Sequence, residues 1–240
     1  MPFGKEKIMK VTQNKNLYQI TWAPYIFPIN CYVWEDKNEL FVIDMGVKSF
    51  VSEIEKISRK LKKPVSKLLL THAHADHVSG VPLFHQKFPK TEIGISQRDL
   101  RLIRGDFTLL PTESQNKIRG SFSKNIIHID FTFKNKDILS TLEVIESSGH
   151  TPGSVSFFDT SSKTLIAGDA FQTRGGIAVS GTLKIFFPFP SLATWNSKVA
   201  LTSAKKLRKL NPTLLAVGHD ILLSDPIEQI EKAIRAAERK

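Results

Sequence analysis

The sequence predicts a mixed α/β (α+β) fold in which each half of the chain contributes a β-sheet with helices on its outer face. Short apolar or alternating segments typical of strands recur in both halves, and amphipathic segments typical of helices lie between them. No Gly/Ser-rich linker or shift in composition marks a boundary within the 240 residues. We therefore expect one domain over residues 1–240, a length that suffices for a sizeable core.

The first part of the chain predicts strands followed by a helix. Strands are expected at residues 18–21, 31–34 and 40–43, with a hairpin turn at 35–38. An amphipathic helix is expected over 48–63, because apolar residues recur there at helical spacing. These residues are Phe50, Val51, Ile54, Ile57 and Leu61. A buried strand at 67–70 follows the helix.

The middle and end of the chain predict further elements of both kinds. Helices are expected over 80–88 and 96–105, the second with a capping box that begins at Ser96. Residues 106–124 contain Pro and Gly with few periodic apolar positions, which predicts a helix-loop insertion. The remaining expected strands are 126–129, 142–147, 154–159, 164–167 and 214–217. A helix is expected over 195–210, and a last one begins with Asp225 as its cap and Pro226 at its first position.

The chain carries an excess of basic residues, 34 Lys and Arg against 23 Asp and Glu, for a net charge of +11. Such a charge suits nucleic acid, anionic lipid or an acidic substrate. The basic residues are spread along predicted helix faces, as at 58–63 and 205–209, where solvation of an exposed face explains them. A nucleic-acid partner is therefore not expected.

Two further features concern the cellular compartment. Residues 1–10 lack the apolar run of a secretory signal, and no apolar stretch approaches the length needed to cross a bilayer. We expect a cytoplasmic protein with no membrane partner. The one cysteine, Cys31, excludes an internal disulfide and a thiolate cluster, and its strand-like surroundings predict a packed core thiol. Nothing in the sequence specifies an oligomeric state.

A cluster of potential metal ligands follows the predicted strand at 67–70. His72, His74, Asp76 and His77 place imidazole and carboxylate donors within six residues, a set that suits zinc, iron or manganese. Three more candidates also follow predicted strands, and each is preceded by glycine: His150, Asp169 and His219. Since strand ends can meet at one edge of a sandwich, these seven side chains are candidates for one site.

The motif H-x-H-x-D-H at His72–His77 and the three later candidates resemble the ligand pattern of the metallo-β-lactamase fold superfamily. The resemblance extends from Asp44-Met45-Gly46 to Val217-Gly218-His219. It implies a four-layer αββα sandwich. It also implies a first metal on His72, His74 and His150, a second on Asp76, His77 and His219, and Asp169 as the bridge. Asp44 would orient a ligand histidine; the alternative is an ordinary turn aspartate.

Two divalent metals, zinc by preference with iron or manganese as alternatives, supply hydrolytic chemistry. Two such ions about 3.5 to 4 Å apart could hold a bridging water and lower its pKa towards neutrality, and the resulting hydroxide would be able to attack a carbonyl or phosphoryl centre. Asp76 and Asp169 are the expected catalytic carboxylates. Asp76 can also relay a proton, whereas Asp169 sets the spacing of the metals.

The branches of the superfamily differ in residues that this sequence shows. Classical β-lactamases of the fold often place a cysteine on the second metal, which is absent here. Glyoxalase-II-type thioesterases share the seven ligands but add a C-terminal helical domain, and only 21 residues follow His219. Acyl-homoserine lactonases are nearer in size and often have a tyrosine where this chain has Gln172. Lactones, esters or thioesters are therefore the expected substrate class, with a nucleic-acid phosphodiesterase as the alternative.

A small-molecule substrate is the expected partner, and its contacts are predicted in the segment 171–190. The candidates there are Phe171, Gln172, Phe186, Phe187 and Phe189. Aromatic side chains beside a metal site suit an apolar acyl chain or ring. The alternative is that these phenylalanines pack the segment onto the core. His85 and His128 are expected to have structural roles only.

Overall fold

The structure is a computed structural model that describes residues 9–239, so most of the amino-terminal segment 1–10 lies outside it. One sheet has seven strands in sequence order: β1 (Met9–Asn14), β2 (Leu17–Trp22), β3 (Ile29–Glu35), β4 (Leu40–Ile43), β5 (Val65–Leu70), β6 (Glu92–Ser96) and β7 (Phe131–Phe133). Strands β1 to β4 are antiparallel, and β4 to β7 are parallel. This sheet comes from residues 9–133.

The second half forms a six-stranded sheet in the order β15-β14-β11-β10-β9-β8. Its strands are β8 (Ile138–Leu139), β9 (Leu142–Glu146), β10 (Val155–Asp159), β11 (Thr164–Ile166), β14 (Leu214–Ala216) and β15 (Leu223–Ser224). Only β11 and β14 pair in parallel; the other neighbours are antiparallel. A small ladder pairs β12 (Phe171–Gln172) with β13 (Ala178–Val179).

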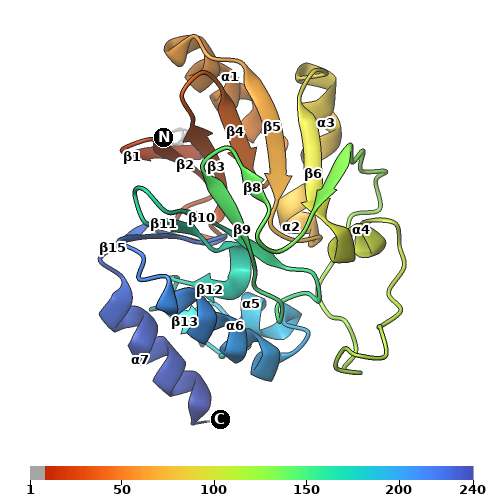
Figure 1. Ribbon diagram of the computed structural model, residues 1–240, viewed down its shortest axis with the longest axis vertical. Helices are drawn as coiled ribbons and strands as arrows, with labels where there is room; N and C mark the ends of the chain where they lie inside the picture. The colour runs from red at the N-terminus through yellow and green to blue at the C-terminus, as the bar shows by residue number, and fades with distance from the viewer. Residues whose placement is uncertain (1–8, 240) are drawn as a thin grey trace, which may run out of the picture.

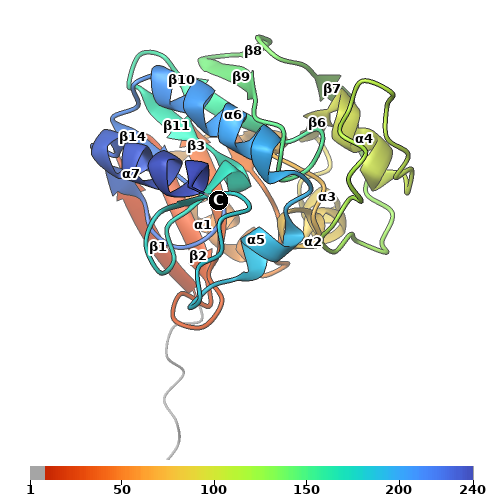
Figure 2. The same ribbon diagram turned by 90° about the horizontal axis from the view of Figure 1, so that it is seen from below.

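Helices cover the outer face of each sheet (Figure 1). On the first sheet these are α1 (Phe50–Leu61), α2 (Ala75–Val78), α3 (Val81–Lys87) and α4 (Gln97–Ile103). On the second, α6 (Ser197–Lys209) and α7 (Ile227–Glu238) lie side by side, as Figure 2 shows. The short α5 (Phe189–Ala193) and the 3-10 helix η1 (Gly168–Ala170) complete the helices of the described chain. None of the helices within residues 9–239 is long and apolar enough to cross a bilayer.

Three apolar cores hold these layers together. In β4, Leu40 and Val42 pack against α1 and α3, whereas Phe41 and Ile43 alternate to the other face and meet the second sheet. A third core lies between the second sheet and α6 and α7. Because central strands are buried on both faces, they form continuous apolar runs in the sequence. The predicted mixed fold and the four-layer αββα sandwich are both confirmed.

Several predictions about single elements are wrong. The segment 126–129 is not a strand: Ile126 is 93% exposed, and pairing with β6 begins only at Phe131. Residues 106–124 contain no helix and run as an irregular loop. Asp225 does not cap α7, because its backbone is left-handed (φ 48°) and Pro226 takes the cap position without a side-chain hydrogen bond. The capping box predicted at Ser96 forms only in part: the side chain of Ser96 accepts a hydrogen bond from the amide of Asp99, but the carboxylate of Asp99 bonds to Ala73, Thr151 and Gly153 and not back to Ser96.

Candidate metal centre

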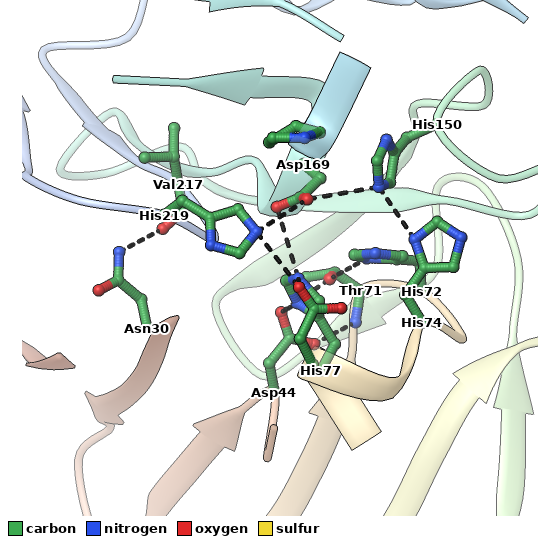
Figure 3. Close-up of polar contacts among 12 residues, drawn as sticks. Asn30, Asp44, Thr71, His72, His74, His77, His150, Asp169, Val217 and His219 are labelled. Atoms are coloured by element: carbon green, nitrogen blue, oxygen red, sulfur yellow. Dashed lines mark hydrogen bonds and ion pairs between the residues drawn. The ribbon is translucent and has the colours of Figure 1, made fainter. Parts of the chain in front are cut away.

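The seven candidate ligands lie close together where strands of both sheets end, and Figure 3 labels all of them except Asp76. The segment His72–His77 begins directly after β5 and leads into α2. From the second sheet, His150 follows β9, Asp169 lies in η1 after β11, and His219 follows β14. The fold therefore brings together side chains that are up to 147 positions apart in the sequence.

The side chains form three overlapping groups whose ligand atoms lie within 4.8 Å of one another. The groups are His72, His74 and His150; His72, His77 and Asp169; and Asp76, His77 and His219. Asp169 is in the middle: one oxygen lies 3.5 Å from Nε2 of His77, and the other lies 3.3 Å from Nε2 of His150 and 3.2 Å from Nε2 of His219. This arrangement suits two cations that share one carboxylate.

The outer nitrogen of each histidine ring is held by an oxygen atom. Nε2 of His74 donates to the carbonyl of Arg119 (2.9 Å), and Nδ1 of His219 donates to the carbonyl of Pro28 (2.7 Å). The other three outer contacts are Nδ1 of His72 with Thr71 (3.0 Å), Nδ1 of His77 with Asp44 (2.7 Å) and Nδ1 of His150 with Ser180 (2.8 Å). Such contacts fix the tautomer and leave the inner nitrogen of each ring as a free ligand.

The inner atoms of the site fit a metal ion because several are buried without a partner. Nε2 of His72, Nε2 of His77 and Oδ1 of Asp169 have no hydrogen-bond partner among the residues that the structure describes. In addition, Nδ1 of His74 lies only 3.0 Å from Nε2 of His150, so two ring nitrogens face each other. Buried polar atoms without partners are costly, and cations bound within these groups would satisfy them.

The pKa values divide the histidines into two classes. Burial lowers the pKa of His72 and His74, and lowers that of His150 to about 3, so these rings are neutral. Burial also acts to lower the pKa of His77 and His219, but nearby aspartates outweigh it. Asp44, Asp169 and Asp76 raise the pKa of His77 to about 9. Without a metal, the second group therefore holds protons where the first does not.

Glycine before a ligand permits close approach, as the sequence predicted. A Cβ atom on Gly218 would lie 2.0 Å from Oδ1 of Asp169 and 2.7 Å from Cε1 of His77. Gly168 has a left-handed backbone (φ 50°), and a Cβ there would lie 2.8 Å from Oγ1 of Thr71. A larger residue at either position would displace the site.

A cavity of about 330 Å³ opens onto the candidate ligands. His74, Asp76, His150, Asp169 and His219 form one wall, and Phe27, Phe189, Pro190, Leu192 and Ala193 form another. Of the five candidate substrate contacts, Phe189 lies on this wall. Phe171, Gln172 and Phe187 are almost fully buried and pack in the interior, and Phe186 is 88% exposed, away from the lining. The three buried residues pack in the interior, as the alternative of core packing implies.

Some residues of the site could not be found from the sequence. Phe27 lies in the loop between β2 and β3, far along the chain from every ligand, and carries no motif. Arg119 contributes through its backbone carbonyl, which any residue has. By contrast, His85 and His128 stack on each other away from the site, with ring centroids 4.6 Å apart, and Cys31 is fully buried in the core.

Comparison with known proteins identifies the family of the chain. The sequence-family model described as the metallo-beta-lactamase superfamily matches residues 24–219. The uncharacterized protein YobT of Bacillus subtilis is 43% identical over 232 residues, which cover 96% of this chain and 100% of YobT. The hydroxyacylglutathione hydrolase GloC of Haemophilus influenzae is 30% identical over 202 residues, which cover 80% of this chain and 86% of GloC.

The fold also matches solved structures. A metallo-beta-lactamase from Pontibacter korlensis superposes with a TM-score of 0.71 at 16% identity, over 97% of this chain and 100% of that chain. The match covers both sheets and the helices outside them. Together with the histidine and aspartate cluster, these findings show that the chain belongs to the metallo-beta-lactamase superfamily and is a hydrolase of that superfamily.

Proposed function

We propose that this protein hydrolyses small carbonyl substrates, namely lactones, esters or thioesters, with two divalent metal ions, zinc by preference. The observation that supports the proposal is the position of Asp169, whose two oxygens face separate histidines of the two candidate groups. The ring nitrogens on its two sides are either neutral or carry a proton that a metal can displace. A carboxylate between two such sets of nitrogens is suited to hold two cations side by side. Two such cations are an established means of hydrolysis at neutral pH.

The two ions would be held by different residues. His72, His74 and His150 would hold the first, Asp76, His77 and His219 the second, and Asp169 both. When bound, the ions supply Lewis acidity towards a carbonyl oxygen and lower the pKa of a water molecule towards neutrality. Imidazole and carboxylate donors without a thiolate suit zinc, and they also accept iron or manganese.

Asp76 differs from the other candidate ligands in its access to the cavity. Its side chain is 29% exposed, whereas those of His77, Asp169 and His219 are almost fully buried. Burial raises the pKa of Asp76, but His77 and His219 outweigh this and hold the pKa well below its usual range. Its carboxylate therefore stays ionised at neutral pH and can accept a hydrogen bond from water or from a leaving group in the cavity.

The apolar part of the cavity lining favours a substrate with an apolar group. Phe27 and Phe189 are in edge contact, with ring centroids 4.9 Å apart, and Leu192 continues the same wall. A substrate carbonyl directed at Asp169 would lay its apolar part along these side chains. The relative from Haemophilus influenzae is named for a hydroxyacyl substrate, which is consistent with attack at an acyl carbon.

The test combines elemental analysis with a hydrolysis screen. Purified protein would be assayed with lactones, esters, thioesters and phosphodiesters, each with and without an apolar group, before and after chelation and zinc reconstitution. We expect about two metals per chain and metal-dependent turnover of carbonyl substrates. The Asp169→Ala protein, purified in the same way, controls for contaminating hydrolases. Turnover of phosphodiesters alone would favour the nuclease alternative, and turnover that survives complete metal removal would exclude the proposed centre.

A further inference from the structure

Asp99 is a fully buried carboxylate at the start of α4, outside the candidate ligand set. It accepts three hydrogen bonds from two separate loops. Oδ2 accepts from the amide of Ala73 (2.9 Å) and from the hydroxyl of Thr151 (2.7 Å), and Oδ1 accepts from the amide of Gly153 (2.8 Å). Both oxygens are therefore used, and both loops carry ligands of the candidate site.

The donors of these hydrogen bonds are neighbours of the first group of histidines. Ala73 lies between His72 and His74, and Thr151 directly follows His150. The two loops belong to different sheets, since one follows β5 and the other joins β9 to β10. Asp99 is thus a direct side-chain link between the two parts of the sandwich that supply this group.

The side chain next to Asp99 reinforces the same link. Ser96 accepts a hydrogen bond from the amide of Asp99 (3.1 Å) and donates one to the carbonyl of Gly153 (2.6 Å). A Cβ atom on Gly153 would lie 2.5 Å from Oδ1 of Asp99, so the loop after His150 is packed directly against the carboxylate. The start of α4 therefore holds this loop through both side chains.

The chemistry of the position requires a carboxylate. Each oxygen accepts from a backbone N–H, so an asparagine would direct its NH2 group at the amide of either Ala73 or Gly153, and that amide would lose its acceptor. Burial raises the pKa of Asp99 to about 6, while the hydrogen bonds from Thr151, Ala73 and Gly153 oppose this rise. A buried charge is costly unless it is well paired, and here three donors offset the cost.

We infer that Asp99 is a positioning residue that holds the His150 loop against the His72–His74 loop, so that these three histidines can share one metal ion. The inference rests on the proposed metal centre, whose ligands Asp99 does not touch. Asp99 bears on the two groups unequally. Ala73 lies on the segment that also carries Asp76 and His77, but the bonds from Thr151 and Gly153 hold the His150 loop, which serves the first group alone. Among the described residues, Asp99 makes no side-chain hydrogen bond to the loop of His219 or to Asp169. Loss of Asp99 should therefore weaken the first metal selectively.

The experiment measures zinc affinity, by competition with a chromophoric chelator, in two backgrounds of the full chain. His219→Ala retains the first histidine group, and His150→Ala retains the second. We expect Asp99→Asn to weaken zinc binding about 10–100-fold in the His219→Ala background, the range typical for partners that orient ligands. In the His150→Ala background the change should be less than about threefold. A purely structural role would lower both affinities or neither.

Asp159→Asn is the matched control. Asp159 is also a buried carboxylate and accepts hydrogen bonds from Ser161 and Ser162, but it lies at the far end of β10 from the loop of His150. We expect it to lower the melting temperature without changing zinc affinity in either background. If Asp99→Asn does not fold, Thr151→Val removes one of the three hydrogen bonds and should give a smaller loss in the same background only.

The outcomes distinguish the inference from the proposed function. If the unmodified protein binds no zinc, the proposed metal centre itself is wrong. If it binds two zinc ions and both Asp99→Asn and Thr151→Val leave both affinities unchanged, only the role of Asp99 is overturned. Equal weakening in the two backgrounds would likewise overturn it, since the selective link to His150 would then be absent.

Discussion

Oδ2 of Asp44 lies 2.7 Å from Nδ1 of His77, and both side chains are buried. The same oxygen accepts a hydrogen bond from the hydroxyl of Thr71, which in turn lies 3.0 Å from Nδ1 of His72. One carboxylate thus orients a candidate ligand in each group, directly for His77 and through a hydroxyl for His72. The turn aspartate of the sequence makes the contacts of an orienting residue.

The first prediction is that Asp44→Asn lowers metal affinity or kcat about 10–100-fold. Asp44 accepts hydrogen bonds from the amide and hydroxyl of Thr71 and from His77, and an asparagine cannot accept from all three. Metal content and kcat would be measured after equilibration with a fixed zinc buffer, with Asp159→Asn as the control. Full metal content and a kcat within about twofold of the unmodified protein would show that Asp44 has no orienting role.

The second prediction concerns proton release on metal binding. The pKa of His77 is raised to about 9 in the metal-free protein, so its ring is protonated at pH 7 and must lose this proton before Nε2 can bind a metal. Although burial acts to lower it, the pKa of His219 is also raised by Asp169 and Asp76, so this ring must likewise lose a proton. Affinity for the second metal should therefore rise as the pH is raised from 7 to 9. The first group should show little of this dependence in the same range, because the pKa of His150 is lowered to about 3.

Calorimetry in buffers of different ionisation enthalpy would count the protons released at each step. His150→Ala isolates the second group and His219→Ala the first, so the two steps are measured separately. A second-group affinity that does not change between pH 7 and 9 would contradict the assignment of His77 as a protonated ligand.

The sequence was sufficient to predict that the later candidate ligands lie at strand ends and come together. Asp169 and His219 follow short strands that are buried throughout, and His150 follows β9, which is buried at Leu142, Val144 and Ile145, so their positions after a strand could be predicted from local pattern. The ligand cluster at His72–His77 needed no long-range information. In these cases the local sequence and the final fold favour the same structure.

Other parts depend on contacts that no local pattern contains. β6 was missed because it is short and interrupted by Gly94, which is needed since a Cβ there would lie 2.5 Å from the ring of Phe131. Asp99 looked like part of a helix cap, but only its amide serves the cap, whereas its carboxylate bonds to residues 26 to 54 positions away. Phe27 lies at the cavity, where it packs on Phe189. These two residues are far apart in the sequence, so their contact forms only in the folded chain.

The third prediction compares the loss of a candidate metal ligand with the loss of a histidine outside the site. Asp169→Ala should lower kcat more than about 100-fold, because a lost ligand costs more than a lost orienting partner. His85→Ala should change kcat by less than about twofold, since His85 stacks on His128 outside the site. Both variants would be compared at equal zinc and protein concentration, with circular dichroism to verify folding. Similar losses in the two variants would mean that the ligand assignment is wrong.

The fourth prediction concerns the apolar wall. Phe189→Ala removes a half-exposed ring from the cavity, which should weaken binding of an apolar acyl group by about 1 kcal/mol, or roughly fivefold in KM. Acetyl substrates, which offer only a methyl group for burial, should be less affected. Phe186→Ala is the matched control, since Phe186 is exposed and lies outside the lining. Equal effects on long and short substrates would exclude the wall as an acyl-binding surface.

The last prediction tests whether the net charge of +11 serves nucleic-acid binding. On α6, Lys205 pairs with Glu238 of α7 (2.6 Å) and Arg208 pairs with Glu231, so part of the basic face is already neutralised within the protein. Binding to DNA or RNA should therefore be weak and should collapse between low and physiological salt, as counterion release requires. Hydrolysis of a neutral ester or lactone should barely respond, because attack takes place in a shielded cavity.

Both quantities would be measured on one preparation, by fluorescence anisotropy for nucleic acid and by initial rates for hydrolysis. A variant with Lys205, Lys206, Arg208 and Lys209 replaced by glutamine should lose the residual low-salt binding, since nonspecific affinity falls with each phosphate contact removed. Its kcat/KM should stay unchanged, because α6 packs on the outer face of the second sheet. Tight, structure-selective RNA binding at physiological salt, with metal-dependent cleavage of that RNA, would instead establish the nuclease alternative.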